Sequence, residues 1–154
     1  MSEVTIETVD PDGAEARACL ATYEAELQAR FPRGFDAAGA AAVPAPPMRA
    51  PHGVFLVARR GGEAIGCAGL RSHGDWGEVK KLWVAPAARG LGLARRLMAA
   101  VEASAREMGL GVLRLDTNSA LPEAIALYRR SGWVEIDRFN DDPNPDIFFE
   151  KRLD

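Results

Sequence analysis

The feature that most constrains this chain is a junction near its middle, where a strand-like run passes into a helix through a turn with two glycines. The run covers residues 78–84 and stops before Pro86, and the glycines of the turn are Gly90 and Gly92. The helix is predicted from apolar residues that recur on one face at helical spacing, namely Leu93, Leu97, Val101 and Met108. Gly109, just beyond them, ends the helix.

The charge of the junction indicates an anionic ligand. Arg89, Arg95 and Arg96 gather around the N-terminus of the helix, where the helix dipole already disfavours cations. Because Gly90 and Gly92 carry no side chain, backbone N–H groups there can close around phosphate oxygens. Surface arginines beside an ordinary strand-to-helix connection are the alternative. The combination of strand, proline, arginine, glycines and apolar helix favours a turn that binds pyrophosphate.

Two common phosphate-binding motifs do not fit this turn. A dinucleotide-binding fingerprint would have a third glycine in the place of Arg95, and a P-loop would end in Gly-Lys-Ser/Thr. The spacing that remains is Arg-x-x-Gly-x-Ala, from Arg89 through Gly92 to Ala94, after a Val-x-Pro strand exit. This spacing resembles the coenzyme A-binding motif of the GCN5-related N-acetyltransferases (GNAT).

The resemblance covers nearly the whole chain, from about residue 4 to residue 152. Residues 66–70, 78–84 and 113–118 resemble the third, fourth and fifth strands of that family, in order. The Leu-Tyr-x-x-x-Gly-aromatic pattern at residues 127–133 is a second specific signal, independent of the first. Among subgroups, the chain is most similar to acetyltransferase modules that some bacteria fuse to a MarR-type DNA-binding domain, although this sequence contains no such domain.

The order of the predicted elements implies an α+β fold. Strands are predicted at residues 4–8, 54–60, 63–71, 78–84, 113–118, 133–136 and 147–151, and helices at residues 14–30, 37–42, 93–108 and 121–130. We expect a GNAT-like three-layer α/β/α arrangement, in which about four helices cover a central, mostly antiparallel mixed sheet of about seven strands. The resemblance further implies that strands 4 and 5 splay apart and admit coenzyme A. Neither face of residues 78–84 is cleanly apolar, which predicts a β-bulge that shifts the alternation.

Length and composition limit the function classes. The 154 residues predict one N-acetyltransferase domain, residues 1–154, with the 47% hydrophobic and 27% charged residues of an ordinary globular protein. A net charge of −3 without a basic block argues against nucleic-acid binding. The acidic N-terminal segment does not resemble a signal peptide, and no apolar run reaches the ~18 residues of a membrane span, so we expect a cytoplasmic protein. Cys19 and Cys67 lack metal or redox spacing and His52 and His73 lie far apart, so no metal site is expected.

Acetyl-CoA is the cosubstrate that the resemblance implies. The residues expected to bind it are Leu82, Trp83, Val84, Arg89, Gly90, Leu91, Gly92, Leu93, Ala94, Arg95 and Asn118. Unpaired backbone at residues 82–84 would bond the pantetheine amides as a neighbouring strand would. Asn118 ends the fifth strand, where family members often place a side-chain amide near the cofactor. It fits equally well as a cap for the turn at residues 119–122, and both interpretations stay open.

Tyr128 is the residue that we expect to assist departure of the coenzyme A thiolate. A phenol with a pKa of about 10 is a weaker acid than a thiol with a pKa of about 8.5, so full proton transfer is uphill by about 2 kcal/mol. A hydrogen bond to the developing thiolate avoids most of that cost. A core tyrosine bonded to a carbonyl is the alternative, and the Leu-Tyr-x-x-x-Gly pattern favours the catalytic role.

Glu78 is the candidate general base, because it stands six residues before Val84, at the offset of the catalytic glutamate in the histone-modifying members of the family. A carboxylate with a pKa of about 4.3 matches an alkylammonium poorly, so Glu78 would act through water or need a raised pKa. A strand-end glutamate paired with a lysine is the alternative, and His73 and Asp75 are other candidate bases. Cys67 is interpreted as a packed thiol rather than a nucleophile, which predicts direct attack in a ternary complex.

The acceptor is expected to be a primary amine of a small molecule or a peptide. The resemblance places it near the first two helices and the last hairpin, where Phe31, Arg33 and Phe35 offer aromatic surface and one cation. Four aspartates of the last hairpin would attract an ammonium group: Asp137, Asp141, Asp142 and Asp146. A solvated acidic turn explains them as simply, and we favour it. An exposed final strand would permit a homodimer formed by sheet extension.

Two other functions stay open at this point. One is a noncatalytic sensor that binds acyl-CoA without turnover. The other is an acyltransferase that uses another short acyl-CoA, because no sequence signature marks the acyl pocket.

Overall fold

One mixed sheet organises residues 3–154, the part of the chain that the computed structural model describes. Its seven strands lie in the spatial order β1-β2-β3-β4-β5-β7-β6. The strands are β1 (Val4–Thr8), β2 (Gly53–Arg60), β3 (Glu63–Ser72), β4 (Gly77–Val84), β5 (Val112–Thr117), β6 (Val134–Ile136) and β7 (Ile147–Arg152). The helices are α1 (Ala14–Arg30), α2 (Ala37–Ala41), α3 (Leu93–Glu107) and α4 (Pro122–Arg130), and a 3₁₀ turn, Pro86–Ala88, precedes α3.

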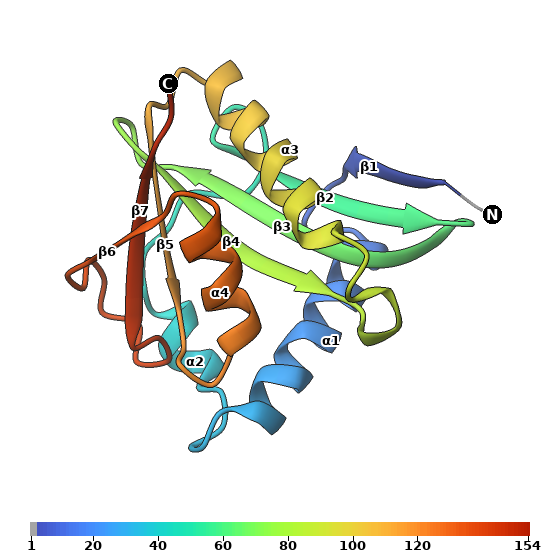
Figure 1. Ribbon diagram of the computed structural model, residues 1–154, viewed down its shortest axis with the longest axis horizontal. Coiled ribbons are helices and arrows are strands. Elements are labelled where there is room, and N and C mark those ends of the chain that lie inside the picture. The colour runs from blue at the N-terminus through green and yellow to red at the C-terminus, as the bar shows by residue number, and fades with distance from the viewer. Residues whose placement is uncertain (1–2) are drawn as a thin grey trace.

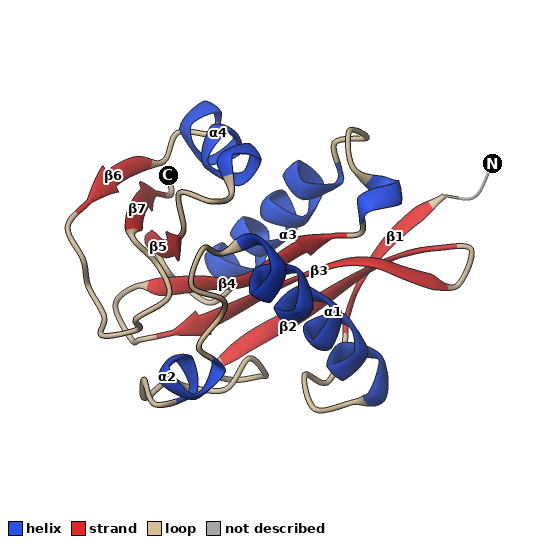
Figure 2. Cartoon of the chain, turned by 90° about the horizontal axis from the view of Figure 1, so that it is seen from below, coloured by secondary structure: helices blue, strands red, loops and turns tan. Residues whose placement is uncertain are grey.

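Helices cover both faces of the sheet. Helices α3 and α4 lie on one face and α1 and α2 on the other, as Figure 1 and Figure 2 show. Neighbouring strands are antiparallel except for β4 and β5, which pair in parallel. The predicted three-layer α+β arrangement, with a mostly antiparallel mixed sheet, is confirmed.

Strand β2 shows why both faces need a helix layer. Phe55 and Val57 belong to the core on the α1 side, together with Cys19. Leu56 and Ala58 belong to the larger core under α3 and α4. Because successive side chains of a strand point to opposite faces, an apolar run of this kind must be covered on each side.

Strands β4 and β5 splay apart almost from their start. They pair over two residues of each strand, the pairing ending at Glu78 and Arg114. Strand β4 also bulges, since Lys81 and Leu82 together stand opposite the single residue Ala68 of β3. The bulge gives Lys81 a φ of 62°, in the left-handed region. The predicted splay and bulge are therefore confirmed, and beyond Glu78 the β5 side of β4 has no strand paired with it among the residues described.

The element bounds agree with the prediction to within a few residues, and the main difference lies at the C-terminal end. Strand β7 lies between β5 and β6 and pairs with both. The final strand is therefore not an exposed edge, and the predicted route to a homodimer through that strand is wrong. The edges of the sheet are β1 and the three-residue strand β6. Within residues 3–154, no helix has the length and apolar character that crossing a membrane requires.

Candidate active site

The glycine turn ahead of α3 has an open geometry. Gly90 and Gly92 have φ values of 83° and 75°, in the region that glycine adopts readily. A side chain built on either glycine would meet none of the described residues within 4 Å, so the space in front of the turn is free of protein. Gly92 is the N-cap of α3 and provides no side-chain cap. The N–H groups of the first helical turn are therefore available to a ligand.

A cavity of about 620 Å³ opens at this turn and lies between α1, β4, α3 and α4; we call it the turn cavity. Most of the residues predicted to bind the cofactor line it: Leu82, Trp83, Val84, Arg89, Gly90, Gly92, Leu93, Ala94 and Arg95. Two of the predicted residues do not. The side chain of Leu91 points outward, since the residue is 65% exposed, and Asn118 lines a different cavity.

The three arginines around the turn have different partners. Arg89 donates from Nη2 to both oxygens of Glu26 in α1, at 2.6 and 2.7 Å, and from Nε to the Val84 carbonyl at 3.0 Å. Arg96 donates to a backbone carbonyl of β1 at 3.2 Å. Arg95 lines the turn cavity and has no ion pair within residues 3–154. The expectation that all three cations await an anion is wrong for Arg89, which a protein carboxylate already neutralises. Of the other two, only Arg95 lines the turn cavity, and its contact with an anion stays a prediction.

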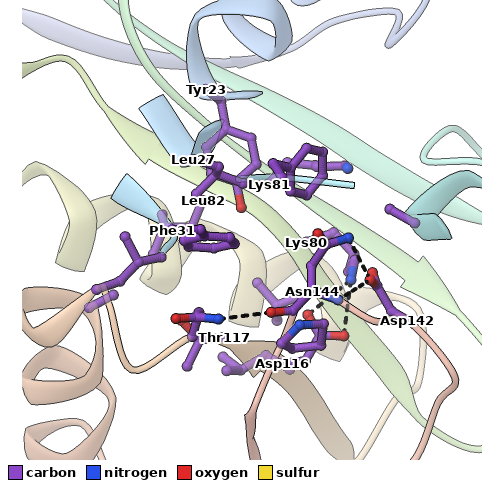
Figure 3. Close-up of a pocket in the computed structure, with 18 of the residues that line it drawn as sticks. Tyr23, Leu27, Phe31, Lys80, Lys81, Leu82, Asp116, Thr117, Asp142 and Asn144 are labelled. Atoms are coloured by element: carbon purple, nitrogen blue, oxygen red, sulfur yellow. Dashed lines mark hydrogen bonds and ion pairs between the residues drawn. The ribbon is translucent and has the colours of Figure 1, made fainter. Parts of the chain in front are cut away.

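A second, smaller cavity of about 80 Å³ lies where β4 and β5 diverge, and we call it the wedge cavity. In Figure 3, Tyr23 and Leu27 line it from α1, while Asp116 and Thr117 come from β5. The wedge cavity adjoins the turn cavity, because both are lined by the same residues: Tyr23, Leu27, Leu82, Leu121 and Ala124. A long ligand that enters at the glycine turn can therefore end between β4 and β5.

Tyr128 of α4 lines the wedge cavity. The residue is 5% exposed, and its ring packs against Trp133 and Phe149 at centroid distances of 5.9 and 5.8 Å. Its hydroxyl makes no hydrogen bond to any residue between 3 and 154, so the alternative of a core tyrosine bonded to a carbonyl does not apply. Burial, and then the charge of Asp116, raises the pKa of Tyr128. The phenol therefore stays protonated and able to donate.

A third cavity of about 390 Å³, the outer cavity, opens beside α2. It adjoins the wedge cavity through shared lining residues: Ala40, Lys80, Lys81 and Asp142. Glu78 lines the outer cavity and is 6% exposed. Its carboxylate lies 2.9 Å from Nε2 of His73 and 3.6 Å from Nζ of Lys80. Asp75 is exposed and lines none of the three cavities. Glu78 and Tyr128 thus line different cavities, joined through the wedge.

Asn118 forms part of the turn that follows β5. Its Oδ1 accepts from the Ala120 N–H and its Nδ2 donates to the Asn144 carbonyl, both at 2.8 Å. These bonds confirm the capping interpretation. The side chain also lines the wedge cavity, so a place beside the cofactor stays a prediction.

The residues expected around the acceptor separate into two groups. Phe31, Phe35 and Asp142 line the wedge cavity. Arg33 lines none of the three cavities, and Asp146 instead accepts two hydrogen bonds, of 2.8 and 2.7 Å, from the turn after β5. The other two aspartates are exposed. The favoured interpretation, a solvated acidic turn, therefore fits three of the four aspartates.

Two polar residues of the wedge cavity, Tyr23 and Asp116, were not predicted. Tyr23 lines both the wedge and the turn cavities, and burial raises its pKa. Asp116 lies 3.1 Å from Nζ of Lys80 and accepts from Asn140 at 2.7 Å. The alternation at residues 113–116 places Asp116 on the side opposite the core, which is a usable signal. No such signal marks Tyr23, because the apolar residues of α1 form no helical stripe.

Comparison with known proteins gives a consistent result. Residues 17–133 match the acetyltransferase (GNAT) family. The chain is 42% identical over 103 residues to an IAA acetyltransferase of Azospirillum brasilense, covering 64% of this chain and 67% of that protein. It is 33% identical over 133 residues to the N-alpha-acetyltransferase RimI of Mycobacterium tuberculosis, covering 80% and 75%.

The fold gives the same result as the sequence. A crystal structure assigned to an acyl-CoA N-acyltransferase of Klebsiella pneumoniae superimposes with a TM-score of 0.76, at 32% identity and with 97% of both chains covered. These relatives do not bear on the narrower likeness to modules fused to MarR-type regulators, which stays a prediction.

Proposed function

The chain belongs to the acetyltransferase (GNAT) family, and from that premise we propose that it transfers the acetyl group of acetyl-CoA to a primary amine of a small molecule or peptide. The reaction is direct attack in a ternary complex, within one domain that spans residues 1–154. The observation that carries the proposal is the unobstructed turn at Gly90 and Gly92, which opens into a cavity that leads to the β4–β5 wedge.

In this proposal the diphosphate of acetyl-CoA binds the N–H groups of the glycine turn, including that of Leu91, and the side chain of Arg95. Free N–H groups and the helix dipole both favour an anion at such a helix N-terminus. The pantetheine arm lies along residues 82–84, where the β5 side of β4 has no paired strand and can offer backbone hydrogen bonds. The thioester then reaches the wedge cavity, beside Tyr128 and Asn118.

Acetyl transfer requires a hydrogen-bond donor near the thioester sulfur and a base near the nitrogen of the acceptor amine. The amine nitrogen attacks the thioester carbonyl carbon, so that a C–N bond forms, the C–S bond breaks, and the nitrogen loses a proton. The coenzyme A sulfur departs as a thiolate, takes up a proton and leaves as the thiol. Tyr128 donates a hydrogen bond to that sulfur, and its raised pKa keeps the phenol in the donating form.

Glu78 and His73 act together as the base that receives the amine proton. The carboxylate is buried and lines the cavity through which we expect the acceptor to enter. It lies 2.9 Å from Nε2 of His73, which is exposed and lines none of the three cavities. The carboxylate can take up the proton directly or through one water, and the exposed imidazole beside it can pass the proton on to solvent.

Two observations support an enzyme that uses a short acyl group. The outer cavity gives a second molecule its own access to the wedge, which a sensor of acyl-CoA alone does not need. The wedge cavity is small, at about 80 Å³, which suits a short acyl chain.

Thiol release from acetyl-CoA, measured with a panel of primary amines, tests the proposed function. We expect release that requires an amine and a product that mass spectrometry identifies as the N-acetyl derivative. Binding of acetyl-CoA without amine-dependent release would favour the sensor. Faster release from propionyl- or succinyl-CoA would change the assigned acyl donor.

A further inference from the structure

Two cations of the outer cavity have no counter-ion. Arg71 of β3 and Lys81 at the β4 bulge both line this cavity. Within residues 3–154 neither has a carboxylate oxygen within 4.0 Å, and Nε of Arg71 is buried without a hydrogen-bond partner. Both residues are half-buried, and a charge that is partly removed from water without a partner is unfavourable. Binding of an anionic ligand explains why an open cavity keeps two such cations.

Three carboxylates of the same region are already engaged, and Glu24, which also lines the cavity, has no oxygen within 4.0 Å of either cation among the described residues. Glu78 contacts both His73 and Lys80. Asp116 lies 3.1 Å from Nζ of Lys80, and Asp142 accepts from a backbone N–H at 2.9 Å. If Glu78 or Asp116 turned toward another cation, Lys80 would lose an ion pair. A bound anion would supply the close contact that these carboxylates do not make with Arg71 and Lys81.

The acid–base properties of the two cations agree with this geometry. Burial lowers the pKa of Lys81, and the neighbouring charges of Lys80 and Arg71 lower it further. Burial also lowers the pKa of Arg71. Both pKa values are lowered because the two cations lack enough negative charge close by. An anion bound beside the two groups would raise both pKa values again.

We propose that the acceptor amine also carries a carboxylate, which binds Arg71 and Lys81 in the outer cavity while the amine points into the wedge; this rests on the acetyl transfer proposed above. The guanidinium fork matches the two oxygens of a carboxylate. A singly charged group fits better than a phosphate, because Glu24, Glu78 and Asp142 line the same cavity and would repel a dianion.

The proposal narrows the acceptor to one class of amine. A peptide N-terminus carries an amide where a free amino acid carries its carboxylate, so the cavity selects amino acids and related amino carboxylates over peptides. A volume of about 390 Å³ is in the range of small-molecule sites.

The test compares matched acceptors with the wild-type protein, at saturating acetyl-CoA and with thiol release as the readout. Each amino acid is paired with its carboxamide and with its decarboxylated amine, so that the amine stays and the negative charge is removed. We expect kcat/KM to be at least about tenfold higher for the amino acids, because the carboxamide and the decarboxylated amine each lack the charged group that would form hydrogen bonds in the outer cavity. Equal or higher values for the uncharged partners would overturn the proposal.

Variants of Arg71 test whether this residue causes the preference for acceptors that carry a carboxylate. We expect Arg71→Gln to reduce the preference for the carboxylate by about tenfold, through the KM of the acceptor, and Arg71→Lys to retain part of it. Arg33→Gln is the matched control, because Arg33 is exposed and lines none of the three cavities; it should keep the full preference. A folded Arg71→Gln protein with unchanged preference would contradict the assignment. If this variant does not fold, the comparison of acceptors in the wild type decides.

Failure of the underlying function would give a different result. In that case no amine of any kind would release thiol, and acetyl transfer and the acceptor class would both be overturned. If carboxamides react as well as the acids, acetyl transfer stands and only the acceptor class is wrong.

Discussion

At the scale of single residues, the proposed chemistry depends on a phenol that is held in its neutral form. Tyr128 is packed between aromatic rings, and burial and the charge of Asp116 raise its pKa. This environment makes Tyr128 a poor proton donor in full transfer and a persistent hydrogen-bond donor. Stabilisation of a leaving thiolate needs only the second property.

Tyr128→Phe keeps the packing against Trp133 and Phe149 and removes only the hydroxyl. We expect kcat to fall by about 100-fold, the lower range for removal of one hydrogen-bond donor from a developing anion, because the thiolate loses its donor. The KM for acetyl-CoA should change little, since the glycine turn is untouched. Steady-state thiol release measures both values. An unchanged kcat would make Tyr128 a packing residue.

The burial of Tyr128 also makes stability depend on pH at the alkaline end. The folded-state pKa lies above the unfolded value of about 10, so above that pH the folded state keeps a proton that the unfolded state has lost. The free energy of unfolding should therefore fall as the pH rises past about 10, by up to about 1.4 kcal/mol per pH unit for this group. Urea unfolding at a series of alkaline pH values measures the slope. Tyr128→Phe should show a shallower slope, and equal slopes would argue against a buried phenol.

At the scale of elements, the exit of β4 and the start of α3 form the wall of the turn cavity. Helix α3 begins where Gly92 takes a left-handed conformation without a side-chain cap. The Arg89–Glu26 pair ties the strand exit to α1. Arg89 therefore holds the wall of the cavity in place, and the open N–H groups and Arg95 are the groups that we propose bind the diphosphate.

Gly92→Ala tests whether the glycine turn binds the diphosphate of acetyl-CoA. The left-handed φ of 75° should make the variant less stable by about 1 kcal/mol, and the added methyl enters the space proposed for the diphosphate and should weaken acetyl-CoA binding. Gly109→Ala is the matched control at the other end of α3, with a φ of 77° and equally open surroundings. It should lose similar stability and keep its affinity. Equal affinities of the two variants in calorimetric titrations would remove the turn from the binding site.

The elements could be predicted because their signals are local. Helix α1 was predicted with its observed bounds, Ala14–Arg30, from turn residues on either side of it. The insertion of β7 between β5 and β6 was missed, because partner choice depends on contacts distant in sequence. The Glu26–Arg89 pair was missed for the same reason, since 63 positions separate its members.

The site was also predicted only in part, because local signals could be interpreted and contacts distant in sequence could not. The glycine turn was found because glycine and arginine at that spacing have a local physical reason. Arg71 and Lys81 were not, because each is an ordinary polar residue in its own strand. Their shared cavity exists only once β3, β4 and α2 have assembled.

At the scale of the whole molecule, three adjoining cavities cross the sheet at the β4–β5 wedge. Helix α1 contributes to the lining of both the turn cavity and the outer cavity. The turn cavity is also lined by α3 and α4 residues and the outer cavity by α2 residues, and α2 lies on the opposite face of the sheet from α3 and α4 in Figure 2. Two substrates can thus approach from different sides and meet in the wedge. Cys67 is fully buried and donates from Sγ to the Lys81 carbonyl at 3.2 Å, which argues against a role as covalent carrier.

This arrangement predicts sequential kinetics. Initial rates measured at varied concentrations of acetyl-CoA and amine should give intersecting double-reciprocal lines, because both substrates must be bound before the acetyl group moves. Cys67→Ala should keep its kcat and lose about 1 kcal/mol of stability, since only packing is removed. Parallel lines, or loss of turnover in Cys67→Ala, would indicate an acetylated intermediate instead.

Binding of a diphosphate at the Gly90–Gly92 turn is the claim on which the proposed function depends, and titration calorimetry with two ligands tests it most directly. Coenzyme A carries the diphosphate, whereas pantetheine keeps the arm and the thiol without it. We expect coenzyme A to bind at least about tenfold more tightly than pantetheine, and this advantage to shrink in Gly92→Ala. Equal affinities for the two ligands, or no heat on addition of coenzyme A, would contradict the claim.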